Sequence, residues 1–282
     1  MRARVPASSA NLGPGFDTLA LALALYVEVE VRDAGELRIT ASGEGSDLPA
    51  DREHLAARVV RAVLGHDAVE IVVRSDIPVG RGLGSSASLA AAAAAAAGAA
   101  DPLAVAAAVD GHPENAAASV LGGLVTATTV EGEPLATALP LDEDLAFVVL
   151  VPDRTLPTKE ARAALPSRVP HADAAFNLGR MGLLLAGLAD HRRLVHEAAD
   201  DRLHQSYRTA LFPESVALLA GLRDAGALAA CWSGAGPTLL AFTTAAGADA
   251  VRAAGESLLA DHGVAGRALR LDADRTGLVV GE

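Results

Sequence analysis

The stretch Ile77-Pro78-Val79-Gly80-Arg81-Gly82-Leu83-Gly84-Ser85-Ser86-Ala87-Ser88 decides the fold that this sequence predicts. Before it, residues 68–74 are apolar and β-branched at alternate positions, which predicts a strand. After it, residues 89–97 are almost all alanine, the strongest helix former. A glycine loop between strand and helix leaves backbone N–H groups free at the positive end of the helix dipole, where an anion binds well. We therefore expect a phosphate at this loop, with Ser85 and Ser86 capping the helix.

Two familiar phosphate loops do not fit this stretch. A P-loop ends in Gly-Lys-Ser/Thr, whereas the only lysine of the chain is Lys159. A dinucleotide fingerprint spaces its glycines as Gly-x-Gly-x-x-Gly and has an acid about 20 residues later, at the end of a second strand. Here the glycines alternate with other residues, and Asp101 precedes Pro102 at a predicted helix start. A glycine-rich turn without a ligand is the alternative.

The composition excludes several classes of protein. The net charge of −12 argues against a nucleic-acid partner and against binding to an anionic membrane surface. No segment is apolar enough over sufficient length to cross a bilayer, and the N-terminus has no signal-type core. Cys231 is the only cysteine, so no internal disulfide can form, which fits a reducing cytoplasm. We expect a cytoplasmic protein.

Strands and helices follow one another without regular βαβ alternation, which predicts an α+β fold rather than a doubly wound sheet. Glycine, proline and acidic residues collect between Glu131 and Asp144, and we expect two domains, residues 1–142 and residues 143–282. The expected strands are residues 2–5, 26–32, 36–42, 68–74, 124–130, 146–151, 227–232, 239–243 and 268–272, and the expected helices include residues 54–64, 172–188, 191–199 and 246–262.

Three further polar clusters stand out. Residues 6–17 predict a loop in which Asn11 and Asp17 either hold a ligand or bond to their own backbone. Residues 110–115 either form part of a site or supply cap chemistry for the next helix. Residues 233–238 predict a second glycine loop, between two strands. The sequence has no zinc-ligand spacing and no Gly-x-Ser-x-Gly elbow, so neither a zinc site nor a hydrolase triad is predicted.

Taken together and in this order, residues 6–17, 78–88 and 233–238 resemble the signature of the GHMP kinases. Residues 8–17, 111–115, 158–162 and 202–208 are most similar to the homoserine kinase branch of that family. The resemblance implies an N-terminal domain like ribosomal protein S5 domain 2 and a ferredoxin-like C-terminal domain. It also implies transfer of phosphate from ATP, with Mg²⁺, to the hydroxyl of L-homoserine in threonine biosynthesis, and it is compatible with a homodimer.

The same resemblance implies roles for individual residues. ATP is expected along the loop at Pro78, Val79, Gly80, Arg81, Gly82, Leu83, Gly84, Ser85, Ser86, Ala87 and Ser88, and Mg²⁺ is expected at Ser86 and Asp110. L-Homoserine is expected between Asn11, Asp17, His112, Glu114, Thr158, Arg162, Arg208 and Gly234. Asn11, Asp17 and Asn115 are expected next to the reacting atoms. An arginine fork matches a carboxylate bidentately, which suits the carboxylate of an amino acid.

Three positions differ from the usual pattern of this family. Asp110 stands where glutamate is usual, Glu114 where homoserine kinases generally carry aspartate, and Ser88 where alanine is usual.

No residue is an obvious general base, so we expect Mg²⁺ and the loop to position the phosphate for attack by the hydroxyl. Two alternatives remain: a GHMP kinase for another alcohol such as mevalonate, and a binding protein of this fold that has lost catalysis.

Overall fold

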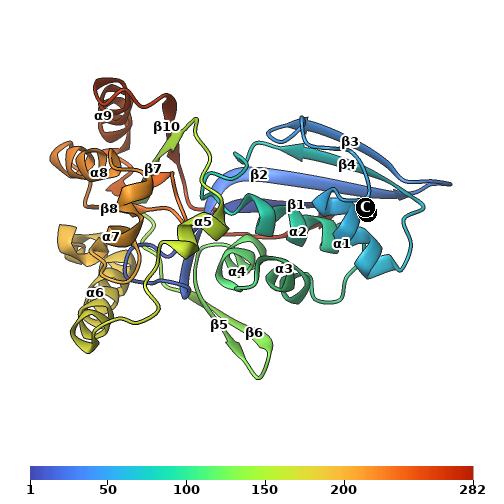
Figure 1. Cartoon of the computed structure of the whole chain (residues 1–282), viewed down its shortest axis with the longest axis horizontal. Helices are drawn as coiled ribbons and strands as arrows, with labels where there is room; N and C mark the ends of the chain where they lie inside the picture. The colour runs from blue at the N-terminus through green and yellow to red at the C-terminus, as the bar shows by residue number, and fades with distance from the viewer. Residues whose placement is uncertain (282) are drawn as a thin grey trace.

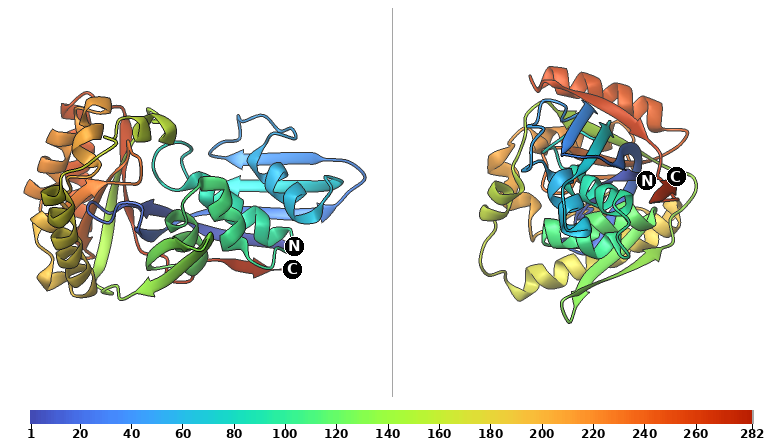
Figure 2. Two further views of the ribbon diagram at one scale, coloured as in Figure 1. Left: turned by 60° about the horizontal axis from the view of Figure 1, so that its bottom comes forward. Right: turned by 90° about the vertical axis from the view of Figure 1, so that its right-hand side faces the viewer.

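The computed structural model describes residues 1–281, and two β-sheets occupy the two halves of its long axis (Figure 1). The seven-stranded sheet has the order β11-β1-β2-β4-β3, and β5 joins it beside β2 and carries β6. The four-stranded sheet has the order β10-β7-β9-β8. Arg2 pairs with Gly281, so the first and last strands are neighbours and both ends of the chain lie side by side (Figure 2).

The first sheet is covered on one face by helices that contact β1 and β2 through α2 and α4 (Figure 1). The long strand β2 pairs with β5 near its start and with β4 near its end, so it holds the sheet together. The elements are β1 Arg2–Ala10, β2 Leu19–Asp33, β3 Arg38–Gly43, α1 Leu55–Leu64, β4 Val69–Ser75, α2 Ser85–Ala96, α3 Pro102–Asp110, α4 Glu114–Leu121, β5 Leu124–Val130 and β6 Glu133–Leu139.

Helix α2 lies at the centre of this half because eight of its twelve residues are buried alanines. A helix that is apolar all round is a core helix. Its small side chains allow α1, α3, α4 and the sheet to approach it from all sides. A larger residue at Ala92, which is fully buried, would cost about 1–3 kcal/mol through overpacking. The core therefore fixes where the N-terminus of α2 points.

The second half has the strand order of a ferredoxin-like fold, in which two βαβ units interleave in an antiparallel sheet. Most of its helices lie on the outer side of the sheet, away from the first half (Figures 1 and 2). The elements are β7 Leu145–Pro152, α5 Thr158–Ala163, α6 His171–Ala189, η1 His191–Arg193, η2 His196–Ala199, α7 Gln205–Arg208, η3 Thr209–Leu211, α8 Ser215–Asp224, β8 Ala229–Trp232, β9 Leu239–Thr244, α9 Ala248–Asp261 and β10 Gly266–Leu271; the last strand, β11 Val279–Gly281, belongs to the first sheet.

The predicted α+β class is confirmed, and so are the two expected halves, each built around its own sheet. The chain leaves the first sheet after β6 and enters the second at β7, and β11 then returns to the first sheet. We propose that the first unit comprises residues 1–142 and the second begins at residue 143, with the strand β11 packed on the first. None of the helices within residues 1–281 has the length and apolar character needed to cross a membrane.

Several local predictions are wrong, each for a tertiary reason. Residues 6–10 continue β1 instead of starting a loop, because residues 7–10 pair with residues 20–23 of β2 after a shift in register at Pro6. The hydroxyls of Ser8 and Ser9 bond to Asn115 and Ser233. Strands β6 and β11 are short and mostly exposed, so their sequences lack the alternation that predicts a strand.

The predicted helix caps also differ from the observed ones. Gly84 is the N-cap of α2 in a left-handed conformation, and the side chains of Ser85 and Ser86 lie inside the first turn instead of capping it. Pro157 occupies the N-cap position of α5, so Thr158, expected at L-homoserine, is the first residue of that helix. The predicted helix at residues 191–199 is two short 3-10 turns, because Leu194 takes an extended conformation between them.

Candidate functional site

A polar cavity lies where the two halves of the molecule meet, and the structure brings most of the predicted site residues to its wall. The wall includes the nine residues expected at L-homoserine or the reacting atoms: Asn11, Asp17, His112, Glu114, Asn115, Thr158, Arg162, Arg208 and Gly234. From the predicted ATP and Mg²⁺ sets, Gly80, Gly82, Gly84, Ser85, Ser86, Ala87 and Asp110 also line it. Segments separated by more than 200 residues thus meet at one place.

Five residues of the predicted ATP loop do not line this cavity. The Leu83 side chain is buried in the core, and Pro78 lies in the loop without lining the cavity. Arg81 donates to the backbone carbonyl of Asp153. The Ser88 hydroxyl points into the protein, where it donates to the carbonyl of Pro6 and bonds to Ser119. Ser88 therefore serves the packing of α2, while Val79 lines a second cavity.

The N-terminus of α2 opens into the polar cavity. Its first N–H groups have no partner within the helix, and no side chain caps them. Gly84 precedes them with φ 68°, and a Cβ at this position would collide with the Ser8 hydroxyl. That hydroxyl bonds to the Asn115 side chain at 2.9 Å. The backbone is therefore held close to the cavity in the arrangement that binds an anion.

The second cavity lies on the other side of the same helix end and is mainly apolar. It has a volume of about 300 Å³, and its lining includes the apolar residues Val27, Ala41, Leu48, Leu55, Val73, Val79 and Leu89 and the acidic residues Glu44, Asp51 and Glu53. Ser85 and Ser86 belong to the walls of both cavities. Sequence reasoning missed this cavity, because the segment from residue 44 to residue 54 has no periodic pattern that assigns it to a wall.

The loop after β1 presents two polar side chains in an unusual backbone conformation. Asn11 has φ 72° and Asp17 has φ 51°, in the left-handed region that Asn and Asp tolerate better than most residues. The Asn11 side chain accepts from the backbone N–H of Asp17 at 3.0 Å and donates to the carbonyl of Gly234 at 2.8 Å. The loop of the first half is therefore fastened to the second glycine loop.

Two arginines from the second half face this loop. Arg162 holds Asp17 with two nitrogens, at 2.6 and 3.1 Å, and this hydrogen bonding raises the pKa of Arg162. Arg208 is almost fully buried and donates to the carbonyls of Gly234 and Ala161. Burial, followed by the charge of Arg162, lowers the pKa of Arg208 to about 10, so it remains a cation at neutral pH.

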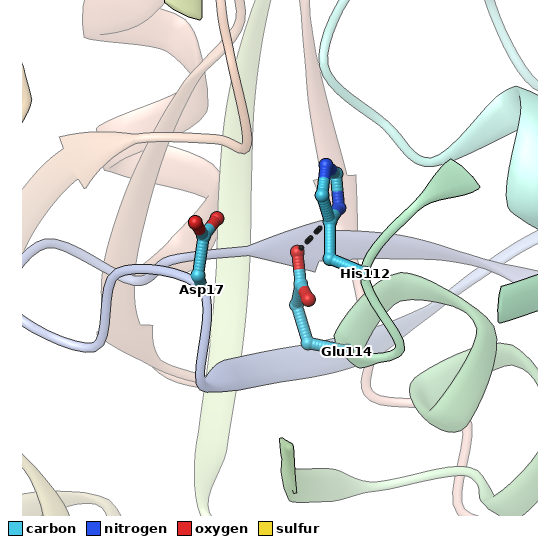
Figure 3. A group of neighbouring side chains, drawn as sticks. All are labelled: Asp17, His112 and Glu114. Atoms are coloured by element: carbon cyan, nitrogen blue, oxygen red, sulfur yellow. Dashed lines mark ion pairs between the residues drawn. The ribbon is translucent and has the colours of Figure 1, made fainter. Parts of the chain in front are cut away.

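Two carboxylates, of Asp110 and Glu114, lie beside His112 in the wall of the same cavity. The Nδ1 atom of His112 is 3.2 Å from a carboxylate oxygen of Glu114 and 4.0 Å from one of Asp110. Figure 3 shows Glu114 at the start of α4, pointing toward His112, with Asp17 across the cavity. The contact with Glu114 raises the pKa of His112, and burial raises the pKa of Asp110.

These carboxylates are suited to a cation. Glu114 is 1% exposed, yet one of its carboxylate oxygens is buried without a hydrogen-bond partner. Ligand atoms of Asp17, His112 and Glu114 lie within 4.8 Å of one another. The hydroxyl of Ser86 and the carboxylate of Asp110 line the same cavity, and Mg²⁺ prefers one or two carboxylates together with phosphate oxygens. The donor set therefore fits an ammonium group and a magnesium ion.

The second glycine loop contributes Gly234 and Ala235 to the wall of the polar cavity. The Ser233 hydroxyl donates to the carbonyl of Gly82 at 2.6 Å, and the N–H of Gly234 donates to the carbonyl of Ala10 at 2.9 Å. Sequence reasoning did not identify His204, which contacts Arg208, as part of this region. The only available signal was its position in the segment from residue 202 to residue 208.

Comparison with known proteins assigns the class. The model of the GHMP kinases N terminal domain matches residues 53–123, which include the glycine loop and α2. The model of the GHMP kinases C terminal domain matches residues 183–261, which include the second glycine loop. With the fold and the uncapped N-terminus of α2 at the polar cavity, these matches define the class as an ATP-dependent small-molecule kinase of the GHMP type.

The relatives narrow the assignment. Homoserine kinase of Streptomyces avermitilis is 45% identical over 97% of this chain and 93% of the relative. Homoserine kinase of Streptomyces coelicolor is 43% identical over 90% of this chain and 87% of its own length. The crystal structure of homoserine kinase from Cytophaga hutchinsonii superimposes with a TM-score of 0.86 at 26% identity, covering 100% of this chain and 97% of that one. Within the GHMP kinases, the chain belongs to the homoserine kinase family.

Proposed function

We propose that this protein transfers the γ-phosphoryl group of ATP to the side-chain hydroxyl of L-homoserine, forming O-phospho-L-homoserine and ADP. The observation that carries this proposal is the meeting of an apolar cavity and a polar cavity at Ser85 and Ser86. A nucleotide with its base in the apolar cavity would bring its phosphates to the N-terminus of α2. Its terminal phosphate would then face the polar cavity, where a small acceptor fits.

The polar cavity supports an amino acid as the acceptor. Arg162 and Arg208 offer cationic groups for a carboxylate, while Asp17 and Glu114 offer carboxylates for an ammonium group. Bidentate pairing of an arginine with a carboxylate is both strong and directional. Since Asp17 and Arg162 already neutralise each other, a zwitterion can replace that contact without leaving either charge unpaired. An alcohol with no charges cannot do so.

Mg²⁺ would be held by Ser86 and Asp110, with Glu114 nearby. When bound, it would neutralise charge on the phosphates of ATP. The protein's own contribution is positioning: the free N–H groups of α2 hold phosphate oxygens, and Asn11 and Asn115 fix the surroundings of the acceptor. Phosphoryl transfer depends mainly on alignment and charge stabilisation, so the hydroxyl needs no strong enzymic base.

ADP release tests this function directly. The protein should release ADP with ATP, Mg²⁺ and L-homoserine, and should be at least about 100-fold less active in kcat/KM with mevalonate, which has no ammonium group. Arg208→Met should raise the KM for homoserine strongly and the KM for ATP little. Comparable activity with mevalonate would assign a different acceptor, and no ADP release with any alcohol would indicate a binding protein without catalysis.

A further inference from the structure

His204 is a fully buried side chain between the two halves of the proposed homoserine site. It lies immediately before α7, the short helix that carries Arg208. Its Nδ1 atom is 3.0 Å from a terminal nitrogen of Arg208, and its Nε2 atom is 2.7 Å from the carbonyl oxygen of Gly13. Gly13 belongs to the loop that presents Asn11 and Asp17. His204 therefore contacts both walls of the site without lining the cavity.

The two contacts fix the protonation of the ring. An arginine guanidinium can only donate, so Nδ1 of His204 must accept from Arg208. A carbonyl oxygen can only accept, so Nε2 must carry the proton and donate to Gly13. The ring is thus a neutral imidazole with one defined tautomer. Burial lowers the pKa of His204 to about 4, which agrees with this assignment at neutral pH.

The surroundings hold His204 in place through other groups. The Asp201 carboxylate accepts from the backbone N–H groups of Leu203, His204 and Gln205 and from the side chain of Asn177, so it fixes the start of α7. Its nearer oxygen is 3.7 Å from the Nε2 atom of His204, farther than the carbonyl of Gly13. Asp201 therefore positions the backbone, while the ring remains available to Gly13 and Arg208.

Phe16 completes the arrangement from the loop side. Its ring stacks on the ring of His204, with centroids 5.1 Å apart and an interplanar angle of 23°. The guanidinium carbons of Arg162 and Arg208 each lie 5.7 Å from the centre of the Phe16 ring. A shift of His204 would consequently move the loop from the first half and the arginine from the second half relative to each other.

We propose that His204 is a positioning residue that sets the distance between Asp17 and Arg208, and with it the affinity for an acceptor that carries both an ammonium group and a carboxylate. This inference rests on the proposed function, because it assigns the two charges of L-homoserine to these residues. His204 acts through its hydrogen bonds to Arg208 and Gly13 and does not itself touch the acceptor. His204 is also not among the residues that line the apolar cavity proposed for the nucleotide base.

Two substitutions of His204 that differ in the hydrogen bonds they remove test its positioning role. His204→Phe keeps the aromatic stacking but loses both hydrogen bonds, and should raise the KM for homoserine about 10- to 100-fold. His204→Asn can place an oxygen near the position of Nδ1 and accept from Arg208, so it should recover part of that loss. The KM for ATP should change less than about twofold in both variants, because no contact reaches the nucleotide side. His196→Asn, at an exposed histidine of the same half, is the matched control and should change neither constant.

Three results would overturn the inference. Equal increases in the KM values for homoserine and ATP in folded His204→Phe would mean that the ring only supports the fold. The same conclusion would follow if the KM for homoserine in the Asn variant were no lower than in the Phe variant.

Nitrogen NMR of the wild-type histidines gives a second readout that needs no activity. It should show His204 as the neutral Nε2–H tautomer from pH 6 to 8, and an imidazolium or an Nδ1–H tautomer would refute the role. Failure of the wild-type protein to release ADP would refute the proposed function instead, and the NMR result would still decide the hydrogen bonding.

Discussion

The two glycine loops look alike in the sequence but have different tasks in the structure. The loop at residues 78–88 ends in helix α2, whose first N–H groups face a cavity and have no side-chain cap. The loop at residues 233–238 uses its N–H groups within the protein: Ser233 donates to Thr238, Gly234 to Ala10 and Gly236 to Ser233. Its carbonyl at Gly234 then accepts from Asn11 and Arg208. A glycine loop binds an anion only where its N–H groups are left unpaired.

The largest expected effect follows from disturbing the first loop at Gly84. Gly84→Ala adds a Cβ that collides with the Ser8 hydroxyl and displaces it from Asn115, so kcat/KM should fall at least about 100-fold. Gly80→Ala is the matched control, because Gly80 has the same φ of 68° but an added Cβ would make only ordinary contacts with Thr155. Steady-state kinetics and thermal unfolding of both variants separate the collision from backbone strain. Equal losses in the two would show that strain alone matters.

The next effect concerns the cation at the first loop. Asp110→Asn removes a carboxylate while keeping its shape, and should raise the Mg²⁺ concentration needed for half-maximal activity about tenfold or more. The KM for homoserine should change less. Titration of activity with Mg²⁺ measures this, and Asp153→Asn, at a carboxylate outside both cavity walls, is the control. An unchanged Mg²⁺ requirement would remove Asp110 from the proposed metal site.

A smaller effect is expected at the second loop. Gly234→Ala should strain the backbone at φ 55° and shift the carbonyl that holds Asn11 and Arg208. We expect a loss of about 1–2 kcal/mol in unfolding free energy and a moderate rise in the KM for homoserine, with the KM for ATP nearly unchanged. Gly263→Ala, at φ 66° with open space around it, reports the cost of strain alone. A larger rise in the KM for ATP than in the KM for homoserine would contradict the assignment of the first loop to ATP and the second loop to homoserine.

The last effect is absent at neutral pH: it is a pH dependence of the free energy of unfolding that His204, behind the second loop, produces in acid. The folded-state pKa of His204 is about 4, below its unfolded value near 6.5, so the unfolded chain binds more protons and stability falls as pH falls. The loss should accumulate from about pH 6.5 toward pH 4. Asp201, Arg208 and Asp17 are the charged groups that act on this ring. Urea unfolding at several pH values should show a smaller acid loss in His204→Asn, and an equal loss would assign the pH dependence to other groups.

Much of this architecture is predictable from local sequence. The strand, glycine loop and alanine helix around residues 68–97 follow from β-branched alternation and helix propensity, and strand β5 has the predicted limits of residues 124–130. The predicted boundary region contains strand β6, which the sequence does not indicate, since a short edge strand owes its structure to its partner β5. The return of β11 to β1 joins residues about 280 positions apart, and no local pattern carries that pairing.

For the site, the sequence by itself determined which residue types are present and in which order, because motifs of glycine, asparagine and acidic residues are local features. It did not determine that Ser88 would turn into the core, that an apolar cavity would share Ser85 and Ser86 with a polar one, or that His204 would stand behind Arg208. These depend on distances between segments far apart in the chain. Packing of the two sheets around α2 sets those distances, and the same packing decides which backbone N–H groups remain free to hold a phosphate.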